Sequence, residues 1–267
     1  MAARAATIVS LITLIAIGAL AWCITGGMLL VRYNADLRPQ QRPYEIFPYG
    51  VLRVGIDPSN PPYAFYADNE MIGLDLELSR AIAAHIGIKV QFVPLGFDGL
   101  YDSLFTDGID MLTSMNVDSG RFDKVTYVEP YFDNGWVLVT ASETTLQSWR
   151  DLSSLQLALE FGSEGDGLAR GWSRRIAPFE VLPYELPDYA LDAVRYGQAD
   201  VALVENITLS QYMREHPDFG HHASFQTNVP LALAIRSDHL PMAQKIREVI
   251  QLMQQTGELQ AILARWL

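Results

Sequence analysis

The sequence is poor in cysteine and in positive charge. Its single cysteine, Cys23, lies in an apolar N-terminal run, which excludes an intrachain disulfide and a metal site built from several cysteines. Over 267 residues, 19 lysines and arginines stand against 31 aspartates and glutamates, and the net charge is −12. The first 48 residues contribute +2, so residues 49–267 alone carry −14. A domain with that charge repels nucleic acid and anionic lipid headgroups, so we expect no nucleic-acid partner.

Signatures of catalysis, metal binding and phosphate binding are also missing. His216, His221, His222 and His239 lack a cysteine or acidic partner at the spacing of metal ligands, which indicates a surface loop. Residues 162–167 contain several glycines but not the Gly-Lys-Ser/Thr ending of a phosphate-binding loop. We therefore expect no cofactor, no metal and no catalytic residue, and predict a binding protein rather than an enzyme.

One long uncharged run, residues 5–31, lies near the N-terminus. As a helix it would extend roughly 40 Å, more than the ~30 Å hydrocarbon core of a membrane. Residues 19–21 (Ala-Leu-Ala) offer a cleavage site, but residues 22–31 stay apolar beyond it. We interpret residues 1–32 as a transmembrane anchor or, alternatively, a signal peptide; both would export the rest of the chain. Residues 33–48, with three prolines, are predicted to be a linker.

Strand-like and helix-like segments alternate after residue 49. Short apolar runs bounded by turn residues predict strands, and Leu74, Leu78 and Ile82 recur at helical spacing before Gly87. This alternation predicts an α/β fold with mostly parallel strand pairing. The predicted strands are residues 51–56, 90–93, 110–112, 136–140, 155–159, 200–204 and 231–235, and later helices are expected at 189–196, 242–256 and 258–267.

One structural unit occurs twice. In residues 105–112 and again in residues 195–203, a helix ends at glycine, an aspartate follows and an apolar strand begins. Polar residues follow each strand: Thr113 and Ser114 in the first unit, Glu205 and Asn206 in the second. Ligands of open α/β sheets lie at the carboxyl ends of the strands. The repeated unit therefore predicts two lobes that face a shared cleft.

Arg121 is the most informative cation of the domain. Residues 110–121 predict a strand, a polar turn and the start of a helix, with Asp118 as its cap. A guanidinium just past small polar residues can receive one carboxylate through two parallel hydrogen bonds. The alternative is a surface arginine at a helix start, where the helix dipole slightly disfavours a cation.

Four motifs extend this interpretation over the whole exported domain. They are residues 73–83 (GLDLELSRAIA), 96–100 (GFDGL), the segment from Arg121 to Tyr131, and residues 257–266 (GELQAILARW). Together and in this order they resemble the extracytoplasmic solute-binding proteins, family 3, of polar amino-acid ABC importers. The resemblance covers residues 51–267.

The resemblance implies a two-lobed, periplasmic-binding-protein-like fold (type II) for residues 49–267. Lobe 1 would comprise about residues 49–133 and 231–267, lobe 2 about residues 134–230, and the chain would cross twice between them. The lobes would close over a small ligand. The implied function is extracytoplasmic binding of a polar amino acid and its delivery to ABC permease subunits. The protein would act at the periplasmic face, anchored in the inner membrane or secreted.

The resemblance assigns the two ends of the ligand to opposite lobes. Arg121 would bind the ligand carboxylate, and Glu205, where the family usually has aspartate, would pair with the α-amino group. Ser114 and Asn116 match positions that hydrogen-bond the carboxylate or the amino group, and Thr113 lies beside them. For Glu205 the alternative is a solvated acid at a strand end.

Phe97 and Asp57 would contact the ligand side chain. Phe97 matches a stacking residue, or else packs in the core. Asp57 matches an acid of the basic-amino-acid branch, or else belongs to an Asp-Pro turn. Asn60 stands where that branch often has a stacking tyrosine, so one aromatic wall is missing unless Tyr63 or Tyr66 replaces it.

Glu164 is the clearest departure from the family pattern, which usually has threonine there, near the ligand carboxylate. A second carboxylate at this place is unfavourable, so either Glu164 points to solvent or the ligand has a second cationic group. Ser163 and the backbone amides that begin the next helix can still bind the anion. Three acids near the cleft outnumber the single arginine, which favours a basic amino acid over glutamate.

Two other functions stay open. Some proteins of this fold are cyclohexadienyl, prephenate or arogenate dehydratases, whose general acid we expect one helical turn past Glu205, where Thr208 stands. The domain could also be a sensory ectodomain that acts through a separate membrane partner. An assay for phenylpyruvate or phenylalanine tests the first alternative, and the neighbouring genes test the second.

Overall fold

The computed structural model describes residues 43–267. The predicted membrane segment, residues 1–32, and most of the predicted linker lie outside the described residues. Within residues 43–267, no helix combines the length and apolar character that crossing a membrane requires. Residues Ile46–Leu267 form one compact unit, and the first described helix, α2, spans Pro43–Ile46.

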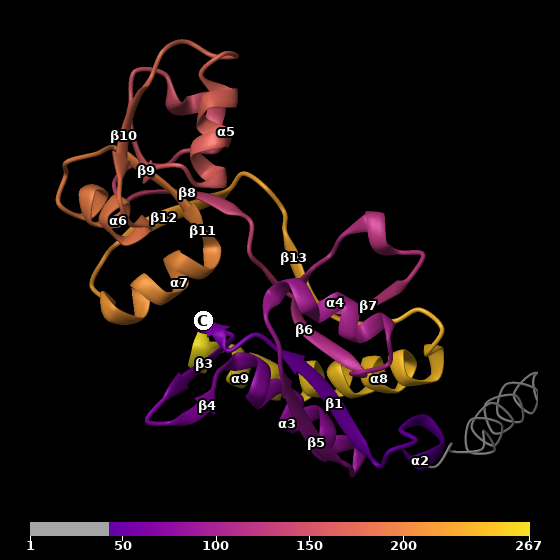
Figure 1. The fold of residues 1–267 in the computed structure, drawn as a ribbon. Helices are drawn as coiled ribbons and strands as arrows, with labels where there is room; N and C mark the ends of the chain where they lie inside the picture. Colours follow the sequence, from indigo (N-terminus) through magenta and orange to yellow (C-terminus); the bar gives the residue numbers. More distant parts are fainter. Residues whose placement is uncertain (1–42) are drawn as a thin grey trace, which may run out of the picture. The chain divides into compact units, whose positions relative to one another are not determined.

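A five-stranded sheet with the order β5-β1-β6-β13-β7 organises the first lobe, which we define as residues 46–133 and 230–267 (Figure 1). Its strands are β1 (Val51–Ile56), β5 (Lys89–Pro94), β6 (Met111–Asn116), β7 (Val125–Asp133) and β13 (Pro230–Arg236). Its helices are α3 (Leu74–Ile86), α4 (Phe97–Phe105), α8 (Leu240–Thr256) and α9 (Glu258–Trp266). The strand β13 therefore returns from late in the sequence to lie between β6 and β7.

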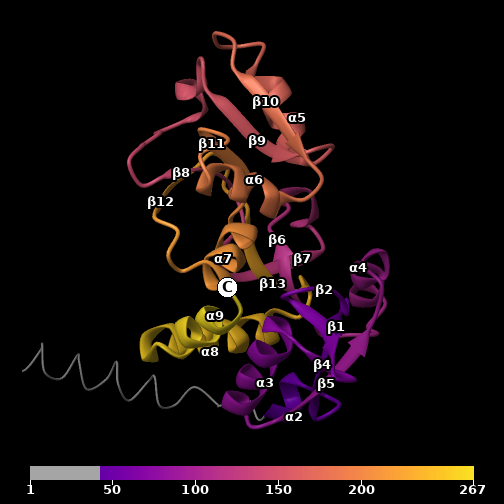
Figure 2. The same ribbon diagram turned by 90° about the vertical axis from the view of Figure 1, so that its left-hand side faces the viewer.

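A second five-stranded sheet, β10-β9-β11-β8-β12, organises the second lobe, which we define as residues 134–229 (Figure 2). Its strands are β8 (Trp136–Ala141), β9 (Gln156–Glu160), β10 (Glu180–Tyr184), β11 (Val201–Glu205) and β12 (His221–Phe225). Its helices are α5 (Glu164–Trp172), α6 (Pro187–Arg195) and α7 (Asn206–Glu215). The predicted surface loop at His221 and His222 is wrong in part, because both residues belong to β12, which pairs with β8.

A small antiparallel sheet, β2-β3-β4, was not expected from the sequence. Its strands are β2 (Ser59–Asn60), β3 (Ala64–Ala67) and β4 (Glu70–Ile72). Asp68 and Asn69, which join β3 to β4, both have positive φ, 49° and 66°. Two successive positive φ angles are typical of the tight turns that close hairpins, and Asp-Asn is a sequence that favours them.

The prediction of mostly parallel pairing is wrong for half of each large sheet. β1 pairs in parallel with β5 and β6, and β9 pairs in parallel with β10 and β11. The other pairs of the two large sheets are antiparallel, through β13 in the first lobe and β8 in the second. These antiparallel strands adjoin the chain crossings, so their direction follows from a chain that enters each lobe from the other.

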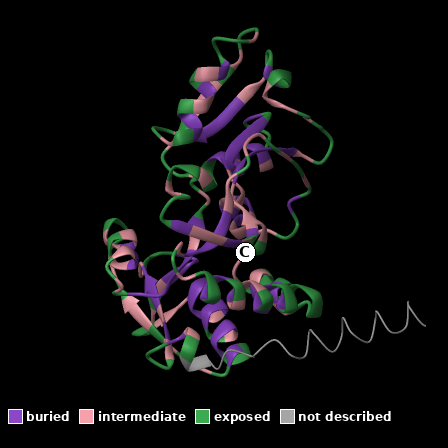
Figure 3. Cartoon of the chain, turned by 90° about the vertical axis from the view of Figure 1, so that its right-hand side faces the viewer, coloured by how far each residue is buried: buried purple, intermediate pink, exposed green. Residues whose placement is uncertain are grey.

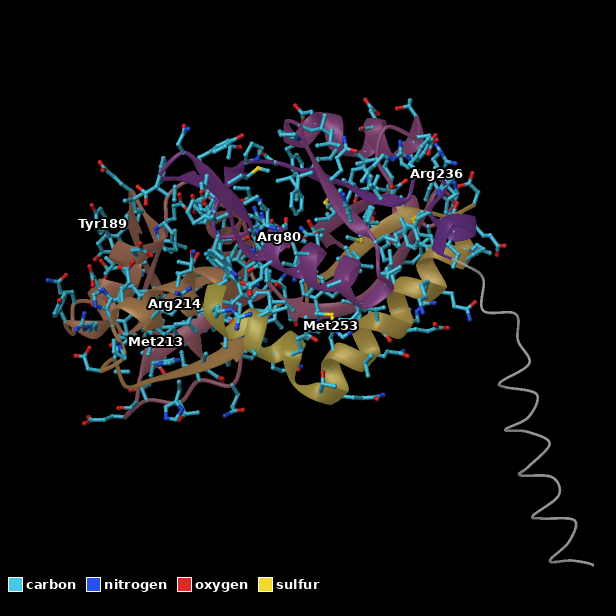
Figure 4. The ribbon with its side chains drawn as sticks, turned by 90° about the horizontal axis from the view of Figure 1, so that it is seen from below. Arg80, Tyr189, Met213, Arg214, Arg236 and Met253 are labelled. Atoms are coloured by element: carbon cyan, nitrogen blue, oxygen red, sulfur yellow. The ribbon has the colours of Figure 1, made fainter. Side chains whose placement is uncertain are left out.

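Apolar residues at helical and strand spacing build the cores. In α3, Leu74, Leu78 and Ile82 are fully buried, and the helix ends at Gly87 with φ 81°, as its sequence predicts. Figure 3 shows the central strands of both sheets as mostly buried and the outer loops as mostly exposed. In Figure 4, Met253, which is buried on α8, lies in the first lobe, whereas Tyr189 lies in the second.

Two short segments, residues 134–135 and 226–229, carry the chain between the lobes. The carboxylate of Asp133 accepts hydrogen bonds from both segments, from the amide nitrogen of Gly135 at 2.9 Å and from that of Val229 at 2.8 Å. The amide of Trp136 donates to the Thr227 hydroxyl at 2.8 Å. The two crossings pack so closely that a Cβ on Gly135 would lie 2.0 Å from the Thr227 carbonyl oxygen.

Replacing Gly135 with alanine tests this packing. The added methyl meets backbone rather than a flexible side chain, so the crossings must separate, and we expect a loss of about 2–3 kcal/mol of unfolding free energy. Thermal unfolding should shift down by roughly 5–10 °C.

Gly167→Ala is the matched control. A Cβ at this position in α5 meets nothing within 4 Å, and alanine is the better helix former, so Tm should stay or rise slightly. An unchanged Tm for Gly135→Ala would contradict the close approach of the two crossings.

Candidate ligand-binding site

One pocket, with a volume of about 500 Å³, receives residues from both lobes. This volume lies in the range of small-molecule sites. From the first lobe it is lined by Asn60, Pro61, Tyr63, Phe97, Tyr101, Ser114, Met115, Asn116, Asp118, Arg121 and Leu231. From the second lobe it is lined by Asn134, Glu205, Ile207, Thr208 and Gln211.

Arg121 lies at the end of one 3-10 turn, Ser119–Arg121. The predicted helix start is therefore wrong, because the turn does not continue as an α-helix, and the polar segment before it belongs to β6. The predicted cap is confirmed: the Asp118 carboxylate accepts from the Gly120 amide at 2.8 Å. Asp118 also accepts from Nε of Arg121 at 3.1 Å. Within the described part of the chain, no acceptor is bonded to the two terminal nitrogens of Arg121, which remain available to a ligand carboxylate.

Two aromatic residues of α4 line the same pocket as Arg121, and one of them contacts it. The guanidinium carbon is 4.1 Å from the centre of the Tyr101 ring, a cation–π contact that holds the side chain in place. Phe97 begins the same helix four residues earlier and is 63% exposed. The core alternative for Phe97 is therefore wrong in this structure, and its ring lines the pocket.

The residues after the predicted first-lobe strand are divided between the pocket and the core. Ser114 and Asn116 line the pocket. Thr113 is buried within β6 and is not among the lining residues. Ser114 has a φ of 50°, unusual for a residue with a side chain, and its amide donates to the Tyr131 hydroxyl at 2.7 Å.

Glu205 ends β11 and lines the pocket from the second lobe. Burial raises the pKa of its carboxyl, and the negative charges of Glu164 and Glu160 raise that pKa further, while a hydrogen bond with Asn134 opposes them. The side chain of Asn134 also accepts from the Ile207 amide at 2.9 Å, at the start of α7. A residue of the crossing thus lies beside the acid that the family resemblance assigns to the ligand amine.

A smaller pocket of about 210 Å³ adjoins Glu205 on the second lobe. Glu160, Glu164 and Glu205 all line it, together with Ser163 and Thr208. Ser163 is the cap of α5, and its hydroxyl accepts from the Asp166 amide at 3.2 Å. Glu164 therefore faces other carboxylates here, and it does not line the pocket that contains Arg121.

Of the other residues predicted to contact the ligand side chain, Tyr63 lines a pocket and Asp57 and Tyr66 do not. Asp57 does not line either pocket; its carboxylate accepts from the amide and hydroxyl of Ser59, at 3.0 and 2.6 Å, which is the turn that was its alternative. Tyr63 lines the larger pocket and is mostly buried, whereas Tyr66 is exposed and lines neither. Tyr63 is therefore the tyrosine available to replace the wall missing at Asn60.

Tyr101, Asn134 and Gln211 are among the lining residues that were not predicted from the sequence. A signal for Tyr101 was present, because residues four apart on a helix share a face, and Phe97 was already predicted. No comparable signal exists for Asn134, because its role depends on where the crossing meets α7.

This arrangement defines a class of protein: two mixed α/β lobes, joined by two crossings, that share a polar pocket suited to a small charged solute. The chain belongs to the bacterial extracellular solute-binding proteins, family 3, whose match spans residues 52–267.

Individual relatives are distant. A probable amino-acid ABC transporter-binding protein of Haemophilus influenzae is 24% identical over 220 residues, covering 80% of this chain and 84% of the relative. An ancestral arginine-binding protein bound to arginine has a TM-score of 0.51 and 26% identity, covering 81% of this chain and 98% of that one. The L-cystine solute receptor of Neisseria gonorrhoeae, in its unliganded open conformation, has a TM-score of 0.71 and 20% identity, covering 83% and 94%. The last likeness concerns the fold alone.

Replacing Glu164 with glutamine tests the electrostatics of the second lobe. It removes one of the two charges that raise the pKa of Glu205, so that pKa should fall while the contribution of burial remains. A lower pKa keeps Glu205 ionised to a lower pH. Carboxyl-carbon NMR titration measures the change directly.

Glu248→Gln, a change of the same type on α8 of the first lobe, should leave the titration of Glu205 unaltered. If Glu164→Gln also left it unaltered, the two carboxylates would not share the smaller pocket.

Proposed function

We propose that this protein binds an amino acid with a cationic side chain outside the cytoplasm and delivers it to an ABC permease. The observation that carries the proposal is that Arg121 and Glu205, from different lobes, line one pocket. Their charges match the two groups that every free amino acid carries. The named relatives, an amino-acid transporter-binding protein and an arginine-binding protein, support the same class of ligand.

The terminal nitrogens of Arg121 suit the ligand carboxylate. Its Nε donates a hydrogen bond to Asp118, and its guanidinium lies over the ring of Tyr101, so the guanidinium is oriented before a ligand arrives. Two charged hydrogen bonds of about 1.5–3 kcal/mol each would supply a large share of the ~8 kcal/mol in a micromolar affinity.

The second lobe favours a ligand with an additional positive charge. Glu160, Glu164 and Glu205 lie around the smaller pocket, and among the described residues none of them forms an ion pair with lysine, arginine or histidine. Closing the lobes over a ligand would remove these carboxylates from water, which is unfavourable unless a cation accompanies them. A guanidinium or ammonium on the ligand side chain provides that cation.

L-Cystine is the second ligand to test. It carries two ammonium groups, so it also offers a second cation to the acids of the second lobe, and a receptor for it shares this fold. Its second carboxylate, however, would need a cation besides Arg121, and no other arginine or lysine lines either pocket.

The dehydratase alternative requires a general acid that can give up a proton near neutral pH. Thr208 lines both pockets at the place where that acid was expected, and its hydroxyl is a poor proton donor. The binding function is therefore the better supported one. Formation of phenylpyruvate or phenylalanine from prephenate or arogenate by the purified protein would establish the alternative instead.

Calorimetric titration with the twenty common amino acids, ornithine and cystine tests the proposal. We expect micromolar or tighter binding of arginine, lysine or ornithine and much weaker binding of glutamate. A folded protein that binds no member of this set would overturn the proposal.

Arg121→Ala should weaken the binding of the best ligand at least about 100-fold, or about 2.7 kcal/mol, because both carboxylate hydrogen bonds are lost. Arg214→Ala is the control: this exposed arginine of α7 lines neither pocket, and Figure 4 shows it on the second lobe. An Arg121→Ala affinity within threefold of the unmodified protein would show that the carboxylate binds elsewhere.

A further inference from the structure

Ser114 is the extra residue of a β-bulge at the wall of the pocket. Met115 pairs with Ala232 and Leu112 pairs with Ala234, so two residues of β6, Thr113 and Ser114, stand opposite one residue of β13. A bulge redirects a side chain and leaves its amide outside the regular ladder. At Ser114 the backbone has a φ of 50°, and the residue lines the pocket.

A second irregularity, in β7, brings Tyr131 to this bulge. Phe132 pairs with Leu231 and Val128 pairs with Leu233, so three residues of β7 stand opposite Ala232 alone. The hydroxyl of Tyr131 accepts from the Ser114 amide at 2.7 Å and lies 3.0 Å from Oγ of Ser114. The Ser114 amide, which the bulge removes from the strand pairing, is thus bonded by the Tyr131 side chain of β7.

Asp75 is the third member of the hydrogen-bonded group that contains Ser114 and Tyr131. It is the second residue of α3 and only 6% exposed, and Oγ of Ser114 donates to its Oδ1 at 2.5 Å. Burial raises the pKa of Asp75 to about 7, against the opposing effect of the Ser114 hydrogen bond. The titratable groups that face it are Tyr63, before β3, and Tyr131, on β7; burial raises the pKa of each tyrosine above its ordinary value.

No cation among the described residues offsets the charge of the Asp75 carboxylate. Among residues 43–267, no lysine, arginine or histidine forms an ion pair with Asp75. Both tyrosines stay protonated through the neutral range, so Asp75 is the one member of this group that changes charge there. Burying an acid without a counter-charge is unfavourable, so packing alone does not explain why Asp75 is bonded to a residue of the pocket wall.

We propose that Asp75 is a positioning residue of the ligand site, which sets the direction of the Ser114 hydroxyl and so makes ligand affinity depend on its own charge. The proposal extends the proposed function, since the ligand used to probe it is the one expected there.

The direction of the hydrogen bonds gives the mechanism. When Asp75 is ionised, the single proton of the Ser114 hydroxyl goes to the carboxylate, so Tyr131 must donate its own proton to Ser114 Oγ. Oγ then offers only a lone pair to the pocket, which suits a ligand ammonium. When Asp75 is protonated, the charge-assisted bond is lost and the Ser114 proton is free to turn toward the pocket, where it opposes an ammonium.

Calorimetry with L-arginine between pH 5.5 and 8.5 tests the proposal on the whole protein. The unmodified protein should bind arginine about tenfold more tightly at pH 8 than at pH 6. Asp75→Asn, which cannot ionise, should bind about tenfold more weakly at pH 8 and lose most of the change between pH 6 and 8. The control Asp68→Asn, at an exposed hairpin turn of the same lobe, should match the unmodified protein.

A readout without ligand separates this inference from the proposed function. The amide NMR signal of Ser114 should titrate near neutral pH in the free protein and should stay constant in Asp75→Asn. Should arginine not bind while this titration is present, the proposed ligand fails and the positioning role stands.

An unchanged pH profile in a folded Asp75→Asn, or a Ser114 amide that does not titrate, would overturn the inference. If Asp75→Asn does not fold, Tyr131→Phe keeps the test open. It should retain the dependence on pH, since Asp75 is intact, while weakening arginine binding at pH 8, since the Ser114 amide loses its acceptor. A Tyr131→Phe protein with unaltered affinity would contradict the assignment.

Discussion

The proposed function depends on one electrostatic constraint: a cation of one lobe and an acid of the other line the same pocket without being bonded to each other. Arg121 is oriented by Asp118 and Tyr101, and Glu205 lies beside Asn134, which lowers the pKa of its carboxyl. Each of these partners belongs to the same lobe as its charge or to the crossing beside it. A ligand with both a carboxylate and an ammonium can therefore join two groups that the protein alone keeps apart.

The fold supplies that separation through its connections. The antiparallel strands β13 and β8 adjoin the crossings, and the Asp133 carboxylate holds the two crossing segments against each other. Asn134 lies within one crossing and contacts both Glu205 and the start of α7. The acid proposed to meet the ligand amine thus lies beside the segment that joins the lobes, so binding there would be coupled to lobe closure.

Local features of the fold were predictable because their causes are local. The apolar spacing and glycine stop of α3, and the glycine-aspartate-strand unit that leads to Glu205, lie within short stretches of sequence. The repeated unit pointed to Ser114 and Glu205, the guanidinium after the polar turn pointed to Arg121, and the family resemblance added Asn116 and Phe97; all five line one pocket. The antiparallel pairing and the bulges at Ser114 and Tyr131 were not predictable from local sequence. They arise where β6, β13 and β7, which are far apart in the sequence, must fit together. Asp57 was predicted to contact the ligand, but its carboxylate already accepts a hydrogen bond from the Ser59 amide. Only the backbone geometry reveals this bond.

A crystal structure of the protein grown with L-arginine would show whether one amino acid bridges Arg121 and Glu205. We expect the ligand carboxylate within hydrogen-bond distance of the terminal nitrogens of Arg121, its α-ammonium beside Glu205, and its guanidinium toward Glu160 and Glu164. A ligand bound in the reverse orientation, with its carboxylate at the start of α5 and no contact to Arg121, would contradict this expectation.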